Sequence, residues 1–330
     1  MIKIGNTELP DFPLLLAPME DVSDPPFRRL CKMHGADLMY SEFISSEGLI
    51  RDAIKSRKKL DIFDYERPVG IQIFGGDEEA MSMSAKIVET VNPDLVDINF
   101  GCPVKKVVCK GAGAGVLKDI DLMVRLTKAV VNSTNLPVTV KTRLGWDTET
   151  INIMEVAERL QEAGIKALTI HARTRAQMYK GEADWDYISK VKNNPNIEIP
   201  IFGNGDIDSP QKALEYRTKY DCDGIMIGRG AIGYPWIFNE IKHFFETGEI
   251  LPEPTVEDRL QAVRQHAKWS AEWKGERVGL LEMRQHYSNY FRGIPHFKDF
   301  KRQFLEVFSL EEMDELIEKT KEFYHEFAAR

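Results

Sequence analysis

The feature that most constrains the fold is an alternation over roughly the first 230 residues. Short apolar runs rich in β-branched residues alternate with amphipathic helical stretches. This alternation is typical of a parallel sheet whose strands are connected by helices. The runs that qualify as strands are Leu14–Met19, Asp37–Phe43, Val69–Gly75, Leu95–Cys102, Val138–Leu144, Ala167–Thr174, Ile199–Gly205 and Gly224–Gly228. Eight strand–helix units close a (β/α)8 barrel, so the sequence predicts a TIM barrel.

The pattern changes after about residue 240, where no further strand is predicted. Pro252 and Pro254 mark a linker, and helical stretches follow over Val256–Glu276, Leu280–Arg292 and Leu310–Ala328. A chain of 330 residues is long enough for a barrel plus a smaller unit. We therefore expect a barrel domain over residues 1–240 and an all-helical C-terminal domain over residues 241–330.

The termini and the cysteines bear on location and on metal sites. The N-terminus has no apolar signal segment, and no stretch has the ~20 apolar residues that span a bilayer. Cys31, Cys102, Cys109 and Cys222 form no C-x-x-C pair, and the histidines show no zinc-ligand spacing. We expect a cytoplasmic, monomeric protein without disulfides, a metal or a membrane partner.

Active sites of such barrels lie at the carboxyl ends of the strands. The fourth predicted strand ends in Asn99-Phe100-Gly101-Cys102-Pro103, which places Asn99 and Cys102 at the barrel mouth. A buried, inert cysteine is the usual alternative. The position at the mouth favours a thiol that acts as a general acid.

The fifth and sixth strands each carry two basic residues on one face. Lys141 and Arg143 alternate with apolar residues, as do His171 and Arg173. Cations on the inner side of a strand are costly unless they are paired or face a ligand. A histidine that is merely buried in the core remains the alternative for His171.

The last two strands indicate a phosphate site. They end in Gly203-Asn204-Gly205-Asp206-Ile207 and Gly228-Arg229-Gly230, where glycines let backbone amides approach an anion. With the rigid turn at Ala17-Pro18-Met19 and the amide of Gln72, these residues outline a path for a flavin mononucleotide. Lys141 would then stabilise the anion of the reduced ring.

Taken together, these motifs resemble the tRNA-dihydrouridine synthases, most closely the bacterial B-type members. The match rests on Ala17-Pro18-Met19, Asp24-Pro25-Pro26-Phe27-Arg28, Gln72, Asn99-Phe100-Gly101-Cys102-Pro103, Lys110-Gly111-Ala112-Gly113-Ala114-Gly115, Lys141-Thr142-Arg143, His171-Ala172-Arg173-Thr174, Gly203-Asn204-Gly205-Asp206-Ile207 and Gly228-Arg229-Gly230. It extends over essentially the whole chain.

The resemblance implies an FMN enzyme that NADPH reduces and that then reduces a D-loop uridine of tRNA. Hydride would pass from flavin N5 to uracil C6, and Cys102 would protonate C5. Such chemistry requires the base to leave its stack. The resemblance implies FMN contacts from Ala17, Pro18, Met19, Gln72, Lys141, His171, Asn204, Gly205, Asp206, Gly228 and Arg229, and substrate contacts from Asn99, Arg143 and Arg173.

The loop after Cys102 departs from the family pattern at Val107-Val108-Cys109, where relatives often carry smaller or more polar residues. Cys109 is thus a second candidate thiol. We favour Cys102, because it has the better position at the barrel mouth.

A net charge of −8 argues by itself against a nucleic-acid partner, but the tail is polarised. Residues 259–302 contain ten basic and four acidic residues, whereas residues 303–330 contain three and eight. The basic part also carries Trp269, Trp273, His286, Tyr287, Tyr290 and Phe291. Basic residues interleaved with aromatics suit RNA, although aromatics in a helical core are the alternative. Lys105, Lys106 and Lys110 add positive charge beside Cys102.

Three other functions share part of this pattern. An FMN reductase or dehydrogenase of a free pyrimidine or another small molecule shares the barrel and the thiol, but does not explain the basic tail. An RNA-binding barrel without activity does not explain Cys102, Lys141 and His171 together. A sugar-phosphate enzyme without redox chemistry would require catalytic carboxylates that are not evident.

Overall fold

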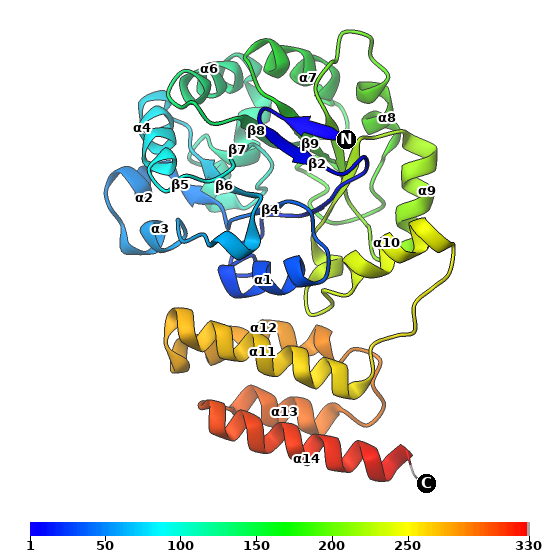
Figure 1. The fold of residues 1–330 in the computed structure, drawn as a ribbon. Coiled ribbons are helices and arrows are strands. Elements are labelled where there is room, and N and C mark those ends of the chain that lie inside the picture. Colours follow the sequence, from blue (N-terminus) through cyan, green and yellow to red (C-terminus); the bar gives the residue numbers. More distant parts are fainter. Residues whose placement is uncertain (329–330) are drawn as a thin grey trace.

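The computed structural model describes residues 1–328 and has two parts. Figure 1 shows a barrel wrapped by helices, with a bundle of long helices beneath it that ends at the C-terminus. No helix among the described residues is long and apolar enough to cross a membrane.

The barrel is built from parallel strands. They are β3 (Leu14–Leu16), β4 (Met39–Tyr40), β6 (Val69–Phe74), β7 (Leu95–Asn99), β8 (Val138–Arg143), β9 (Ala167–His171), β10 (Ile201–Asn204) and β11 (Gly224–Ile227). They pair in the order β3-β11-β10-β9-β8-β7-β6-β4, and a bridge between Leu15 and Leu38 closes the ring. Every predicted strand is present, and the (β/α)8 fold is confirmed.

The first two strands are shorter than predicted. β3 ends at Leu16, just before Pro18, which has no amide hydrogen to donate to a sheet. The predicted strand Asp37–Phe43 is reduced to β4, and a separate short strand, β5 (Ile44–Ser45), pairs with the end of β6. Between them Glu42 accepts a hydrogen bond from the amide of Asp21, which draws the chain towards the first loop.

Helices cover the outside of the barrel. They are α1 (Pro25–Met33), α2 (Ser46–Ile50), α3 (Ile54–Lys58), α4 (Glu78–Glu89), α5 (Lys105–Val108), α6 (Ile120–Val131), α7 (Ile153–Glu162), α8 (Asp186–Lys192), α9 (Pro210–Tyr220) and α10 (Ile237–Thr247), with the 3₁₀ helices η1 (Asp64–Glu66), η2 (Gly113–Lys118) and η3 (Arg229–Ala231). The beginning of α9 shows the sequence features that start a helix. Ser209 caps its first turn by accepting from Lys212 N, and Pro210 occupies the first helical position.

The expected domain boundary at residue 240 falls inside α10. Phe238 and Ile241 of this helix are buried in the barrel core, and α10 packs against α9. We therefore propose that the barrel domain extends to residue 247 and that the boundary lies in the linker 248–255.

A hairpin that the sequence analysis did not predict covers the amino ends of the strands. It consists of β1 (Ile2–Ile4) and β2 (Thr7–Leu9), joined through Gly5 at φ +58°. Ile4 and Leu9 pack with Leu15 and Phe202 in a small apolar cluster. The strands are three residues long, too short to show a clear alternation.

The helical bundle consists of α11 (Val256–Lys274), α12 (Glu276–Tyr290), α13 (Lys298–Glu306) and α14 (Leu310–Ala328). The short helix α13 was not predicted. Trp269, His286, Tyr287, Tyr290 and Phe291 are buried in or beside the core of this bundle. These aromatics stabilise the bundle and present no free ring to an RNA.

The bundle is fastened to the barrel through α1. Phe27 of α1 stacks on His266 of α11, with ring centres 5.7 Å apart. Lys274 donates to Asp24 at 3.0 Å and also pairs with Glu282 of α12. The contacts of Phe27 and Asp24 with α11 fasten the bundle to the barrel.

Candidate active site

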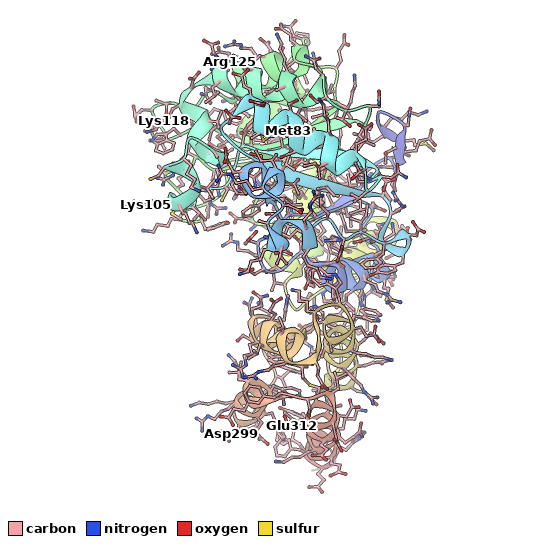
Figure 2. All side chains as sticks on the ribbon, turned by 90° about the vertical axis from the view of Figure 1, so that its left-hand side faces the viewer. Met83, Lys105, Lys118, Arg125, Asp299 and Glu312 are labelled. Carbon is pink, nitrogen blue, oxygen red and sulfur yellow. The ribbon has the colours of Figure 1, made fainter. Side chains whose placement is uncertain are left out.

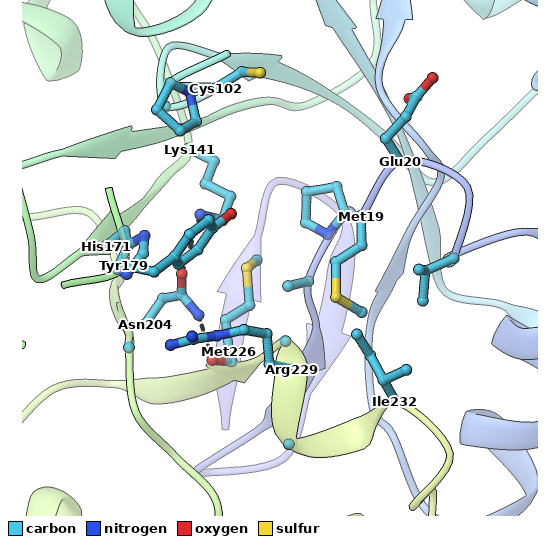
Figure 3. A pocket seen from close by; sticks show the side chains of 18 of the residues that line it. Met19, Glu20, Cys102, Lys141, His171, Tyr179, Asn204, Met226, Arg229 and Ile232 are labelled. Atoms are coloured by element: carbon cyan, nitrogen blue, oxygen red, sulfur yellow. Dashed lines mark hydrogen bonds between the residues drawn. The ribbon is translucent and has the colours of Figure 1, made fainter. Parts of the chain in front are cut away.

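A cavity of about 720 Å³ opens at the carboxyl ends of the barrel strands. Most of the residues that the sequence analysis assigned to a site line it: Ala17, Pro18, Met19, Asn99, Cys102, Lys141, Arg143, His171, Asn204, Gly205, Asp206, Gly228 and Arg229. Figure 3 shows Cys102, Lys141, His171 and Asn204 on one side of this cavity and Met19 on the other. The strand ends thus converge as predicted from their positions in the sequence.

Cys102 follows β7 and is 6% exposed, at the wall of the cavity. Its backbone amide donates to Asn99 Oδ1 at 2.8 Å, which fixes the turn that carries the thiol. Burial raises the pKa of the Cys102 thiol, and nearby Arg143 and Lys141 offset this rise only in part. The thiol therefore stays protonated at neutral pH and could donate a proton to a ligand.

Cys109 lies at the end of α5 and is exposed. It does not line the cavity. The geometry supports the preference for Cys102 as the reactive thiol.

Lys141 is directed into the cavity from β8, and its ammonium donates to Asn204 Oδ1 at 3.1 Å. Burial, reinforced by the charge of Arg143, lowers the pKa of Lys141 to about 7. A negatively charged group placed in the cavity would stabilise the protonated form of Lys141 and raise its pKa again. Lys141 is thus suited to meet a ligand that carries or develops negative charge.

His171 ends β9 and is 6% exposed. Burial and the surrounding cations, Arg143 and Lys141 foremost, lower the pKa of His171 well below its usual value. The ring is therefore neutral at physiological pH. It can donate one hydrogen bond to a ligand or accept one, but it does not add a further positive charge.

The two arginines differ in their place. Arg143 lines the cavity, but its guanidinium donates to the carbonyls of Gly101, Thr174 and Met178. Arg173 does not line the cavity, and it pairs with Asp206 at 2.6 Å. Both arginines hold the loops around the mouth in place.

Gln72 is fully buried and does not line the cavity either. Its side chain donates to Asp97 and accepts from Asn99. The amide thus finds its partners within the barrel, one layer below the cavity floor.

The ends of β10 and β11 form an open cradle. Gly205 has φ +130°, and a Cβ there would lie 2.9 Å from Ala183 Cβ, so only glycine fits. The half-exposed side chain of Arg229, at the start of η3, reaches Asp206 at 3.3 Å. Backbone amides and one cation gathered in this way suit a phosphate group.

Several residues of the cavity wall could not be predicted from the sequence. Tyr179 lies on the loop after β9, with its ring centre 4.7 Å from the Arg229 guanidinium and 5.6 Å from that of Arg143. Arg292 reaches the cavity from the segment after α12. Glu20 lines it from the loop after β3. These residues lie outside the strand ends, and no pattern in the sequence places them.

Known proteins resemble this chain in sequence. A family model described as dihydrouridine synthase matches residues 15–327. The tRNA-dihydrouridine synthase B of Vibrio vulnificus is 41% identical over 304 residues, which cover 92% of this chain and 93% of that protein. The corresponding protein of Pseudomonas aeruginosa is 39% identical over 304 residues, with coverage of 92% and 91%. A probable tRNA-dihydrouridine synthase of Rickettsia conorii is 40% identical over 302 residues, with coverage of 91% and 90%.

Solved structures resemble the chain in fold. A morphinone reductase complex superposes with a TM-score of 0.52 at 12% identity, and covers 78% of this chain and 92% of that one. A 2-naphthoyl-CoA reductase superposes with a TM-score of 0.59 at 13% identity, and covers 73% and 51%. At such low identity these matches show the barrel fold alone.

Proposed function

The chain belongs to the dihydrouridine synthase family, and on that premise we propose that it is a tRNA-dihydrouridine synthase. It would reduce the C5–C6 double bond of a D-loop uridine, with FMN as cofactor and NADPH as reductant. The observation that carries the proposal is the position of the Cys102 thiol, held at the wall of a large cavity that the amine of Lys141 also lines.

The residues of the cavity fit FMN in size and in chemistry. Its volume, about 720 Å³, lies within the ~300–1,000 Å³ typical of sites for small ligands. Asn204, Gly205, Gly228 and Arg229 would hold the phosphate. Asp206 would orient Arg229, because its carboxylate accepts from that guanidinium.

Residues on the other side of the cavity would hold the flavin ring. Lys141 would face the edge of the ring that becomes negative on reduction, since burial and the charge of Arg143 lower its pKa and a negative charge beside it would stabilise the ammonium. Neutral His171 would contact the ring as a hydrogen-bonding partner, and Ala17, Pro18 and Met19 would form the opposite wall. When bound, FMN supplies the hydride that the reduction of uracil requires.

Cys102 would give the proton that completes the reduction. Its raised pKa keeps the proton on sulfur until the carbanion-like C5 develops in the transition state. Asn99 lines the cavity beside it and would contact the uracil. We propose that Arg143 and Arg173 act on the substrate indirectly, by holding the loops at Gly101 and Gly181 to which they donate.

Positive charge for tRNA lies around the mouth and on the bundle. Lys105, Lys106 and Lys110 are exposed on and beside α5, and Arg292 and Lys298 are exposed before and at the start of α13. Figure 2 shows Lys105 and Lys118 on the same side of the molecule as Asp299, the second residue of α13. We propose that tRNA lies along this side, with the helical bundle as its second contact. A tRNA substrate agrees with the cytoplasmic location expected from the sequence.

The proposed function is tested by identifying the product of the reaction. Transcribed tRNA that lacks modifications is incubated with the protein, FMN and NADPH, then digested and analysed by mass spectrometry of its nucleosides. We expect one uridine per tRNA to gain two hydrogens. Reduction of free uracil or uridine, with tRNA left unchanged, would instead identify the small-molecule reductase.

A further inference from the structure

A chain of hydrogen-bonded polar side chains lies in the interior of the barrel. It begins at Asp97 on β7, which is 1% exposed. The carboxylate accepts from Thr139 Oγ1 at 2.5 Å through one oxygen and from Gln72 Nε2 at 2.5 Å through the other. An ionised group in such a place is costly unless its partners are well placed, so its presence calls for a role.

The chain continues upward to the turn of Cys102. Gln72 Oε1 accepts from Asn99 Nδ2 at 2.8 Å. Asn99 Oδ1 then accepts from the backbone amides of Gly101 at 2.9 Å and Cys102 at 2.8 Å. Three hydrogen bonds in series thus connect the carboxylate of Asp97 to the backbone of the thiol-bearing residue.

Both ends of this chain fix its direction. The carboxylate of Asp97 can only accept, so Gln72 must present its NH₂ group to it. The side-chain oxygen of Gln72 is then the atom that faces Asn99, and it must accept a hydrogen bond from the NH₂ group of Asn99. The oxygen of Asn99 is left to face the two backbone amides, which can only donate.

We propose that Asp97 is a positioning residue for Cys102, acting through Gln72 and Asn99. Asp97 locks both amides in the one orientation that the backbone amides also require, so that Asn99 Oδ1 holds the turn at Gly101 and Cys102 in the geometry that presents the thiol to the cavity. The catalytic consequence rests on the proposed function. The positioning is a property of the folded protein, and it can be measured without any catalytic reaction.

The proposal is tested by reversing one bond and then restoring it. Gln72→Glu sets two carboxylates against each other and should break the chain at Asp97. The double variant Asp97→Asn/Gln72→Glu should rebuild it: the new amide donates to the new carboxylate, which still accepts from Asn99. Asp97→Asn alone replaces an obligate acceptor by a group that can donate or accept, so only the backbone amides at the other end still fix the two orientations, and this variant should lie between the two. Thr139→Val is the matched control, because it removes a donor to Asp97 without reversing any bond.

The first readout is the rate at which iodoacetamide alkylates Cys102 in the FMN-free protein, followed by peptide mass spectrometry. Cys31 and Cys222 are buried, and Cys109 is reported on a separate peptide or replaced by serine. We expect a several-fold faster reaction in Gln72→Glu. The double variant and Thr139→Val should return to the wild-type rate.

The second readout separates the two half-reactions in the FMN-loaded protein. Loss of positioning should slow oxidation of the reduced protein by tRNA about 10²-fold, since a displacement of ~1 Å can have such an effect. Reduction by NADPH, which needs no thiol, should remain near the wild-type rate. The double variant should recover most of the tRNA step.

Two results would overturn the proposal: alkylation and tRNA oxidation at wild-type rates in Gln72→Glu, or a double variant no better than the single one. If Gln72→Glu does not fold, Asp97→Asn must accelerate alkylation and the double variant must reverse it, or the proposal fails. If wild-type protein never reacts with tRNA, the proposed function fails, and the alkylation rates still decide the role of Asp97.

Discussion

Cys102 combines a raised pKa with a fixed backbone, two properties that suit a proton donor. We predict that Cys102→Ala lowers the rate at which tRNA oxidises the reduced protein by about 10²–10⁴-fold, the usual contribution of a general acid. Stopped-flow spectroscopy of the flavin measures this rate. Reduction by NADPH serves as the internal reference and should change little.

Cys109→Ala is the matched control, because Cys109 lies on the same loop but outside the cavity. It should retain the wild-type rate with tRNA. Loss of that step in Cys109→Ala, with Cys102→Ala active, would reverse the assignment of the thiols.

Lys141 should stabilise the reduced form of the bound flavin more than the oxidised form. Its ammonium would neutralise the charge that develops on the ring, so Lys141→Met should make the midpoint potential of bound FMN more negative. A loss of ~1.4 kcal/mol corresponds to about 30 mV for a two-electron couple, and we expect a change on this order. Dye-coupled redox titration measures it, and an unchanged potential would show that Lys141 does not face the reducible ring.

Most of the site residues predicted from the sequence do line the cavity, because strand ends in a parallel barrel meet at one face. Lys141 and His171 are such residues. The places of Gln72 and Arg173 could not be predicted, since they depend on hydrogen bonds to Asp97 and Asp206 on other strands and loops. Tyr179 was missed because it lies in a loop whose path no local pattern determines.

At the scale of elements, the contact between α1, α11 and α12 contains two buried histidines. Burial lowers the pKa values of His266 and His286 to about 3, while both would titrate near 6.5 in the unfolded chain. Below pH 6.5 the unfolded chain therefore binds more protons than the folded one. The stability that these neutral rings provide is present above pH 6.5 and is lost as the pH falls towards 3.

We predict that His286→Gln reduces the loss of stability on acidification by up to ~1.4 kcal/mol per pH unit below pH 6, the linkage value for one proton. Urea unfolding at pH 7, 6 and 5 provides the measurement. Comparison of variant with wild type removes the contribution of other groups, such as Asp97. His325→Gln, at an exposed site on α14, should leave the slope unchanged. Equal slopes in wild type and His286→Gln would contradict the account.

The long, periodic elements were predictable and the short ones were not. α11, α12 and α14 were predicted from their periodicity. The hairpin β1–β2 and the nine-residue helix α13 give too few residues for a pattern and are stabilised by tertiary contacts, such as those of Phe300 and Phe304 with the bundle core.

For the whole molecule, the account requires a tRNA path along the mouth and the bundle despite a net charge of −8. We predict that Lys105→Ala/Lys106→Ala/Lys110→Ala weakens tRNA binding and flattens its salt dependence. Each lost phosphate contact should reduce the log–log slope by about 0.7–0.9. Filter binding across a range of salt concentrations measures both quantities.

The matched control is Lys3→Ala/Lys166→Ala/Lys219→Ala, which removes three exposed lysines near the opposite end of the barrel strands. It changes the net charge by the same amount, so affinity and slope should remain as in wild type. Equal effects of the two triple variants would mean that only net charge matters and that tRNA does not bind at the mouth.

The most direct test of the central claim follows the flavin of the FMN-loaded protein without oxygen. NADPH is added until the absorbance is bleached, excess NADPH is removed, and unmodified tRNA is then added. The account predicts that the oxidised spectrum returns with tRNA, and that it does not return with tRNA already carrying dihydrouridine. A flavin that stays bleached with unmodified tRNA but is oxidised by a free pyrimidine would contradict it.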